Sequence, residues 1–143
     1  MAVIEKSVLI PRTVEQMFEL VDRVEDYPKF LPWCGGTELL ERTETLTAAR
    51  IHINYHGIKA HFATENPKEA PHRMDIRLRE GPFRRLDGGW RFTALGTEGC
   101  KVEFRLHYEF SSKMLEKALG PVFSHIIGSF VDCFVKRAHQ VYP

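Results

Sequence analysis

The carboxyl-terminal stretch from Ser111 to Tyr142 constrains the fold more than any other part of the chain. Its apolar residues recur at the i, i+3, i+4, i+7 spacing of an amphipathic helix. They are Leu119, Val122, Phe123, Ile126, Ile127, Phe130, Val131, Phe134, Val135, Ala138, Val141 and Tyr142. At about 100° per residue these side chains cover an arc of roughly 200°, whereas a helix on a flat layer needs a stripe only somewhat wider than ~100°. The sequence therefore predicts a long helix that the rest of the chain surrounds.

The ends of this stretch carry helix signals, and its middle carries one interruption. Ser111 and Ser112 can cap the amino end, and Lys136 suits the negative carboxyl end of the helix dipole. Gly120-Pro121 breaks the pattern, because proline lacks a backbone donor and clashes with the carbonyl four residues earlier. We expect a kink or a restart of the helix there.

Length and composition limit the class of protein. The 143 residues suit a single domain spanning 1–143, which can bury roughly 68–70% of its unfolded surface. A net charge of +1 supplies no global field for binding nucleic acid or an anionic membrane. The three cysteines are an odd number without C-x-x-C spacing, which is typical of reduced thiols in the cytosol. With no signal-peptide core and no apolar run of about 18 residues, we place the protein in the cytoplasm, with at most transient membrane contact.

The chain begins with a strand and a short helix. Ala2 to Ile10 is rich in Val, Ile and Leu and stops at Pro11. Thr13 and Gln16 have the spacing of a capping box, and an apolar helical stripe follows them. We expect this helix to end near Asp22 to Val24.

The next segment, 25–36, holds large apolar residues in a stretch that cannot form a regular helix. Pro28 and Pro32 exclude the regular helix, yet the segment contains Tyr27, Phe30, Leu31 and Trp33, whose apolar area is costly to leave in water. It must therefore pack on something. It is either a lid that closes one end of the core or a lid over a ligand cavity, and the residues alone favour the first.

From Glu38 onward the pattern alternates with the period of a half-buried strand. Residues 49–55 and 58–64 alternate on either side of His56-Gly57, a pair that suits a two-residue hairpin turn. We expect a loop over 67–71, a strand over 73–79 and a turn at Gly81-Pro82. A further strand spans 83–95 with a bulge at Gly88-Gly89. The last strand has the clearest pattern, with Cys100, Val102, Phe104, Leu106, Tyr108 and Phe110 facing inward.

The element order is therefore a strand, a short helix and a lid, about six antiparallel strands, and one long helix. This is the order of an α+β domain. An antiparallel sheet with one wet face needs a cover on the other face, and only the terminal helix is large enough to provide it. A strongly curved sheet around that helix accounts for the wide apolar arc.

The inward positions offer little to a catalyst. Their only polar side chains are Tyr55, Thr64, Cys100 and Tyr108, without a carboxylate pair or an imidazole. General acid–base and nucleophilic catalysis both need a titratable group placed in the site. We therefore predict a protein that is not an enzyme and has no cofactor.

Two other groups of side chains are candidates for binding. His52 and His61 face each other across the hairpin, but no third ligand is near in the sequence, so we predict no metal site. A basic run on neighbouring strands could contact RNA or the ribosome, although a solubilising face is the simpler interpretation. These possible RNA-contact residues are Arg73, Arg77, Arg79, Arg84, Arg85 and Arg91.

Several motifs occur together and in order. They are Tyr27-Pro28-x-Phe30-Leu31-Pro32-x-Cys34, Gly81-Pro82-Phe83, Gly88-Gly89-Trp90-x-Phe92, and the aromatic and aliphatic run after Phe123. On these motifs, and over nearly all of its length, the chain resembles the coenzyme Q-binding START-domain family of the SRPBCC, or polyketide cyclase-like, superfamily. It is most similar to the bacterial ribosome association toxin branch.

The resemblance implies a fold and three functions. The fold is the helix-grip (START/Bet v 1-like) arrangement, with six to seven strands around the terminal helix, one or two short helices after the first strand, and a hydrophobic tunnel. The first implied function is binding of a polyprenyl quinone (ubiquinone) or a related lipid in support of respiratory electron transport. The second is binding of a ribosomal subunit, which blocks subunit joining, and the third is polyketide cyclase or aromatase chemistry. The expected ligand-binding residues are Tyr27, Phe30, Leu31, Trp33, Trp90, Phe104, Tyr108, Phe123, Ile127, Phe130 and Phe134.

Overall fold

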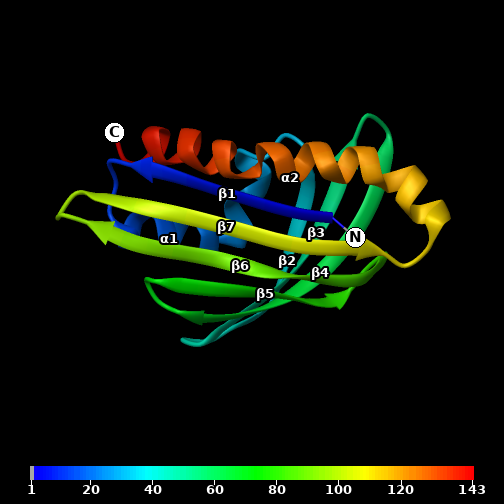
Figure 1. The fold of residues 1–143 in the computed structure, drawn as a ribbon, viewed down its shortest axis with the longest axis horizontal. Helices are drawn as coiled ribbons and strands as arrows, with labels where there is room; N and C mark the ends of the chain where they lie inside the picture. Colours follow the sequence, from blue (N-terminus) through cyan, green and yellow to red (C-terminus); the bar gives the residue numbers. More distant parts are fainter. Residues whose placement is uncertain (1) are drawn as a thin grey trace.

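The computed structural model describes residues 2–143 as a curved sheet wrapped around one long helix (Figure 1). The elements are β1 (Ala2–Ile10), α1 (Val14–Asp22), the 3-10 helix η1 (Val24–Lys29), β2 (Cys34–Arg42), β3 (Leu46–Tyr55), β4 (Ile58–Glu69), β5 (Arg73–Glu80), β6 (Phe83–Leu95), β7 (Gly99–Phe110) and α2 (Lys113–Val141). The strands form one antiparallel sheet in the order β1-β7-β6-β5-β4-β3-β2. The predicted α+β helix-grip fold is confirmed, with seven strands.

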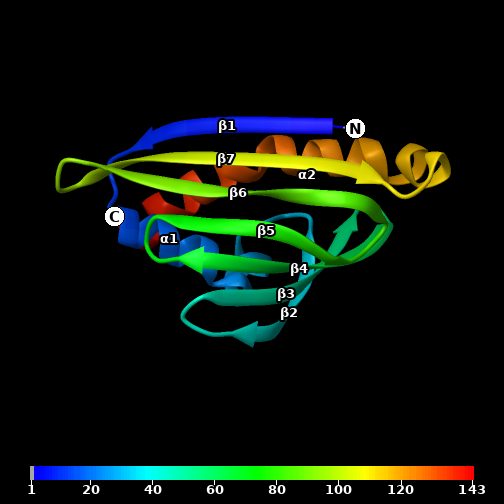
Figure 2. The same ribbon diagram turned by 60° about the horizontal axis from the view of Figure 1, so that its bottom comes forward.

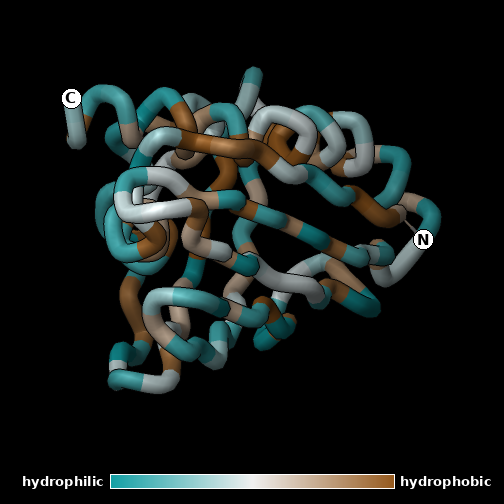
Figure 3. The backbone as a smooth tube through the Cα atoms, turned by 60° about the vertical axis from the view of Figure 1, so that its left-hand side comes forward, coloured by the Kyte–Doolittle hydropathy of each residue, from teal (hydrophilic) through white to brown (hydrophobic). Residues whose placement is uncertain are grey.

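The inner face of the sheet and α2 bury each other. Strands β2 to β4 run steeply across the direction of β1, β7 and β6, so the sheet curves around the helix (Figure 1). Figure 2 shows the strands side by side in the order of the sheet, from β1 to β2. Apolar and polar residues alternate along the strands (Figure 3), and every second residue of β7 is buried. By length and composition α2 could also cross a membrane. Its buried residues pack into the core of this domain and are Phe123, Ile126, Ile127, Phe130, Val131, Phe134 and Ala138.

Two local predictions are confirmed in detail. Thr13 and Gln16 form the expected capping box at the start of α1. The β3–β4 hairpin turns at His56 and Gly57, whose φ angles are 49° and 81°. This turn places His52 opposite His61, with ring centroids 5.7 Å apart.

Of the two alternatives expected at Gly120-Pro121, a kink or a restart, the restart does not occur, because α2 is uninterrupted from Lys113 to Val141. Figure 1 shows its first turns inclined to the rest of the helix. Pro121 has no backbone N–H, so the Lys117 carbonyl lacks the hydrogen-bond donor that a helix normally supplies four residues later. Both Lys117 and Pro121 are exposed. Water can therefore satisfy the freed carbonyl, and the helix tolerates the proline.

The expected bulge at Gly88-Gly89 is also wrong. Both glycines keep an unbroken register with β5 and with β7. They are required for another reason: a Cβ at Gly88 would lie 2.0 Å from the Arg105 carbonyl oxygen, and one at Gly89 would lie 2.7 Å from the Met74 carbonyl oxygen. The two glycines therefore permit a close approach of three backbones where the sheet is strongly curved.

The segment 67–71 is not the expected loop. Strand β4 continues to Glu69, and Pro67 pairs with Leu46 of β3. On the β5 side the register passes from Glu65 to Lys68, so no ladder bond from the proline is needed there.

The lid segment contains the second of the short helices that the resemblance implies, and the strand after it begins earlier than expected. It contains the 3-10 helix η1, with Pro28 inside it, and β2 already begins at Cys34. Only Cys34 of β2 is buried. An exposed edge strand of this kind lacks the alternation that would reveal it in the sequence.

Replacing Gly88 tests the close approach of the backbones. We expect Gly88→Ala to lower the free energy of unfolding by about 3 kcal/mol, because the new methyl group must displace the backbone of β7. Urea denaturation measures the change. Gly36→Ala is the matched control, since a Cβ there meets nothing within 4 Å, and it should change stability by less than about 0.5 kcal/mol. Equal effects of the two substitutions would contradict this explanation.

Candidate functional site

The lid packs on the carboxyl-terminal half of α2. The Tyr27 ring lies 5.4 Å from the Phe134 ring, the Phe30 ring lies 5.1 Å from the same ring, and the Tyr27 hydroxyl donates to the Val21 carbonyl. Leu31 and Trp33 are almost fully buried. The lid is therefore part of the core in this closed conformation.

An exposed ion pair holds the outside of the lid to β2. Arg42 donates to both carboxylate oxygens of Glu25, at 2.8 and 2.9 Å, and to the Asp22 carbonyl oxygen at 2.8 Å. The hydrogen bonds from Arg42 lower the pKa of Glu25 to about 2. Glu25 thus remains ionised throughout the physiological range, and the pair persists there.

A buried polar cluster joins the end of α1 to the sheet. Lys68 Nζ donates to Asp22 Oδ1 and Oδ2, both at 3.0 Å, and to Thr47 Oγ1 at 2.9 Å. Thr47 donates in turn to Asp22 Oδ1 at 2.6 Å. The lysine side chain is only 6% exposed, and all three of its N–H bonds have acceptors. The cluster is therefore a fully satisfied buried ion pair that positions α1.

Sequence reasoning missed this cluster, although a signal for it exists. The inward alternation of Phe62 and Thr64 continues to Asn66 and Lys68, and all four residues are buried. Because a loop was expected at 67–71, the alternation was not followed as far as Lys68. Together Thr64, Asn66 and Lys68 form a polar stripe on the inner face of β4.

A cavity of about 50 Å³ lies between the sheet, α2 and the lid. Seven of the predicted ligand-binding residues line it: Tyr27, Trp33, Trp90, Phe104, Phe123, Ile127 and Phe130. The other four, Phe30, Leu31, Tyr108 and Phe134, pack elsewhere in the core. Sequence reasoning did not place Asn66, Met74, Ile76 and Leu86 on the cavity wall. The volume is well below the ~300–1,000 Å³ usual for a small-molecule pocket, so the implied tunnel is closed in this conformation.

Two polar atoms of cavity-lining residues are buried without a partner. Trp33 Nε1 and Asn66 Oδ1 find no hydrogen-bond partner among residues 2–143. The other end of the Asn66 amide is used, because Nδ2 donates to the Met74 sulfur at 3.8 Å. The residues of the wall therefore include one unused donor and one unused acceptor.

The interior thiols and phenols are poorly suited to catalysis. Burial raises the pKa values of Cys34, Cys100, Tyr27 and Tyr108. A nucleophilic thiol needs a lowered pKa, and a general acid or base works best with a pKa near the operating pH. The geometry of the interior thus favours binding over acid–base or nucleophilic chemistry.

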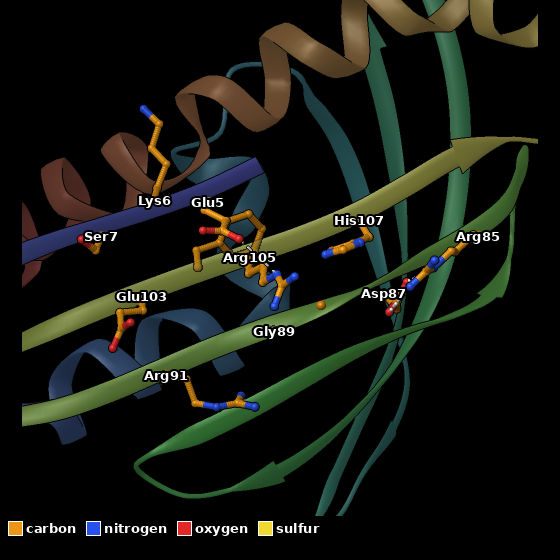
Figure 4. Close-up of a pocket in the computed structure, with 12 residues that line it drawn as sticks. Glu5, Lys6, Ser7, Arg85, Asp87, Gly89, Arg91, Glu103, Arg105 and His107 are labelled. Atoms are coloured by element: carbon orange, nitrogen blue, oxygen red, sulfur yellow. Dashed lines mark hydrogen bonds and ion pairs between the residues drawn. The ribbon is translucent and has the colours of Figure 1, made fainter. Parts of the chain in front are cut away.

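The outer face of the sheet has mixed charge. A groove of about 820 Å³ crosses β1, β7 and β6 over Gly88 and Gly89, which contribute no side chains (Figure 4). Its charged side chains alternate in sign, as in the Arg105–Glu5 pair at 3.3 Å. The groove is much larger than the interior cavity, but it is open to solvent and its walls are largely paired ions.

The predicted RNA-contact arginines are distributed over β5 and β6. Arg73 lies opposite Arg91, and Arg77 lies opposite Asp87. The ion pairs are Arg73–Asp75 at 3.0 Å, Arg91–Asp75 at 3.1 Å, Arg79–Glu65 at 3.8 Å, Arg84–Glu109 at 3.4 Å and Arg85–Asp87 at 2.7 Å. The structure thus brings the arginines onto neighbouring strands but intersperses them with carboxylates.

The histidine pair of the hairpin has an acidic neighbour as well. His52 Nε2 lies 2.8 Å from Glu38 Oε1, and Glu38 also accepts from Arg50 at 2.6 Å. Within residues 2–143 no group of three His, Cys, Asp or Glu side chains is placed to hold a metal ion.

The curved sheet, the central helix and the apolar cavity between them define a protein of the helix-grip class. Residues 10–135 match the family described as polyketide cyclase / dehydrase and lipid transport, and the chain belongs to this family. The resemblance found in the motifs is thereby confirmed.

Two curated relatives cover most of the chain. Ribosome association toxin RatA of Escherichia coli strain K12 is 40% identical over 139 residues, which are 97% of this chain and 88% of that protein. The mitochondrial coenzyme Q-binding protein COQ10 homolog B of Xenopus laevis is 25% identical over 142 residues, which are 96% of this chain and 58% of that protein.

Solved structures agree with the fold. The 18 kDa protein CC1736 from Caulobacter crescentus has a TM-score of 0.74 at 32% identity, with 99% of each chain covered. The ZhuI aromatase/cyclase from Streptomyces sp. R1128 has a TM-score of 0.84 at 15% identity, with 97% of this chain and 94% of that chain covered. At that identity the second likeness concerns the fold alone.

Breaking the buried cluster should be costly. We expect Lys68→Met to lower the free energy of unfolding by about 3 kcal/mol, because it removes the buried cation at 3.0 Å from the Asp22 carboxylate and leaves only Arg42 Nε, at 3.9 Å. Thermal and urea denaturation measure the loss. Arg84→Met, in an exposed pair with Glu109, is the control and should cost less than about 1 kcal/mol. Adding Asp22→Asn to Lys68→Met should recover at least about 1 kcal/mol, and strictly additive losses would argue against the coupling.

Proposed function

We propose that the protein binds a hydrophobic ligand, a polyprenyl quinone or a related lipid, between the sheet and α2 and has no enzymatic activity. The observation that carries this proposal is the aromatic cavity, two of whose lining residues, Trp33 and Asn66, each carry a buried polar atom without a partner. Small-molecule sites typically combine a largely apolar wall with a few polar groups. Two comparisons agree with it: the family description includes lipid transport, and one relative is named a coenzyme Q-binding protein. Such binding would support respiratory electron transport.

The ligand enters by displacing part of the wall. A cavity of about 50 Å³ accommodates a few water molecules and not a substituted ring with a tail. The lid is the part of the wall that can move, since η1 is short and its outer contacts are the exposed pair of Arg42 and Glu25. We therefore expect binding to open the lid while the helix and the sheet remain in place.

Filling the cavity tests this proposal. Ala49 lines the cavity and is buried, so Ala49→Leu occupies the space that the ligand needs. We expect its affinity for decylubiquinone, measured by quenching of tryptophan fluorescence, to fall by about tenfold or more. Ala118→Leu introduces the same side chain at an exposed site of α2 and should leave the affinity unchanged. Wild-type affinity in a folded Ala49→Leu variant would exclude this cavity as the binding site.

A second candidate function is binding of a ribosomal subunit so that subunit joining is blocked. The observation in its favour is the 40% identity to a relative that is named a ribosome association toxin. With a net charge of +1, contact with RNA would rely on a local patch, here the outer face of β5 and β6. Either function would place the protein in the cytoplasm, where ribosomal subunits and the inner leaflet are both accessible.

Charge reversal tests the ribosome candidate. Reversing Arg77, Arg79 and Arg85 to Glu should abolish the accumulation of free subunits that the wild type causes, as seen by sucrose-gradient sedimentation, and should leave decylubiquinone binding intact. The matched control reverses Lys113, Lys117 and Lys136, three exposed cations of α2, and should retain activity. Subunit blocking that survives the arginine reversal would exclude the patch, and a wild type without effect on subunits would exclude the function.

A further inference from the structure

The inner face of β4 changes from apolar to polar along the strand. Its inward residues, in order, are Ile58, Ala60, Phe62, Thr64, Asn66 and Lys68. The first three are apolar and the last three are polar. Side chains two residues apart on a strand share a face and are about 6.6 Å apart. One strand thus presents an apolar end and a polar end to the interior.

A narrow cleft of about 10 Å³ lies at the apolar end of β4. It is bounded by β4, by the turn between β5 and β6 and by α2, which contribute Ala60, Pro82 and Val122 among others. The residues that line it are apolar except His61, whose ring lies 5.7 Å from the ring of His52. Ala60, Pro82 and Val122 are half-buried, so the cleft reaches the surface.

Two aromatic rings separate the cleft from the interior cavity. Phe62 and Phe123 line both spaces, and their ring centroids are 6.0 Å apart in an edge-on contact. The Phe83 ring lies 5.0 Å from the Phe123 ring on the cleft side. A change of rotamer at Phe62 or Phe123 would therefore join the cavity and the cleft into one tunnel.

The helix gives the same order of spaces as the strand. Leu119 and Val122 line the cleft, whereas Ile126 and Phe130, which follow them on α2, line the cavity. The two spaces therefore lie one after the other along α2, which extends over the length of the sheet (Figure 1). The cleft is at the amino-terminal half of the helix, and the polar end of β4 is at the cavity.

We infer that the ligand lies along α2 in one direction, with its polar head at Thr64 and Asn66 and its apolar chain in the cleft. The chain passes from the cavity to the cleft where Phe62 and Phe123 meet. The Thr64 hydroxyl and the Asn66 amide can bind a carbonyl or a hydroxyl group, and the cleft offers apolar contacts. The step from Thr64 back to Ile58 spans about 20 Å along the strand.

The class of ligand follows from this length and polarity. It is an amphiphile with a small polar head and a linear apolar chain, and a prenylated quinone belongs to this class. The inference rests on the proposed function and adds to it the direction of the ligand and a separate subsite for the chain.

A series of ubiquinones with one head and growing chains tests the inference on the full-length protein. Ubiquinone-0 has no chain, ubiquinone-1 has one isoprene unit and ubiquinone-2 has two. We expect the affinity, measured by quenching of tryptophan fluorescence, to rise about tenfold or more with each unit, because each unit buries further apolar area. Equal affinities for the three would overturn the inference and leave the proposed function standing. Failure of all three and of decylubiquinone to bind would overturn both.

Two substitutions in the cleft assign the effect of the chain. Ala60→Trp and Val122→Trp fill the cleft from the strand and from the helix, and neither residue lines the cavity. Each should lower the affinity for ubiquinone-2 about tenfold or more and leave that for ubiquinone-0 unchanged. Ala94→Trp, at an exposed position of β6, is the matched control and should change neither affinity. Wild-type affinity for ubiquinone-2 in cleft variants that circular dichroism shows to be folded would overturn the inference.

Two substitutions at the polar end test the direction of the ligand. Thr64→Val and Asn66→Leu remove the groups that bind the head, so each should lower the affinities for ubiquinone-0 and ubiquinone-2 by the same factor, about threefold to tenfold. A loss confined to ubiquinone-2, or no loss in either variant, would place the head elsewhere and overturn the inference. Should the cleft variants fail to fold, these two variants and the chain series on the wild type decide.

Discussion

The burial of α2 against the inner face of a strongly curved sheet is the interaction on which the rest of the structure depends. The apolar arc of α2 is too wide for a flat layer, and strands β2 to β4 close around the side that β1, β7 and β6 leave open. Phe123, Phe130 and Phe134 are each at least nine-tenths buried, and each contributes roughly 1.5–3 kcal/mol by leaving water. The close approach at Gly88 and Gly89 belongs to the same geometry, since it permits the curvature that the helix requires.

The polar residues of the interior divide into two groups, one with all hydrogen bonds made and one with unpaired atoms. Lys68, Asp22 and Thr47 satisfy one another, so the cluster leaves no donor of Lys68 unpaired and fixes the end of α1. Asn66, two residues before Lys68 on the same face of β4, is only partly satisfied, and Trp33 on the lid is unsatisfied at its nitrogen. A stable interior tends to eliminate such atoms. Their presence around a cavity is the feature of the core that packing alone does not explain.

The sequence was informative wherever one periodicity decided the structure. The helical period gave α2, the strict alternation gave the inner face of β7, and the capping box gave the start of α1. The prediction was wrong where proline or glycine was taken as a break, at Pro67, at Gly88-Gly89 and in part at Pro121. In each case the surrounding structure removed the need for the missing donor or side chain. The loop assigned around Pro67 also hid Asn66 and Lys68, and with them the polar part of the site.

Contacts between strands could not be predicted from the sequence, and they bear most strongly on the second function. Arg91 pairs with Asp75 because the β5–β6 register brings the two side chains together. The positions of the basic residues in the sequence do not reveal that register. To contact RNA, an arginine that is already paired must give up its carboxylate partner for a phosphate. This exchange reduces the binding free energy gained from each arginine–phosphate contact. The outer face of β5 presents Arg77, whereas its inner face presents Met74 and Ile76 to the cavity. Because side chains of a strand alternate between faces, ligand binding inside and contact with RNA outside would use different residues of the same strands. The two activities are therefore separable by substitution, and one chain can carry both.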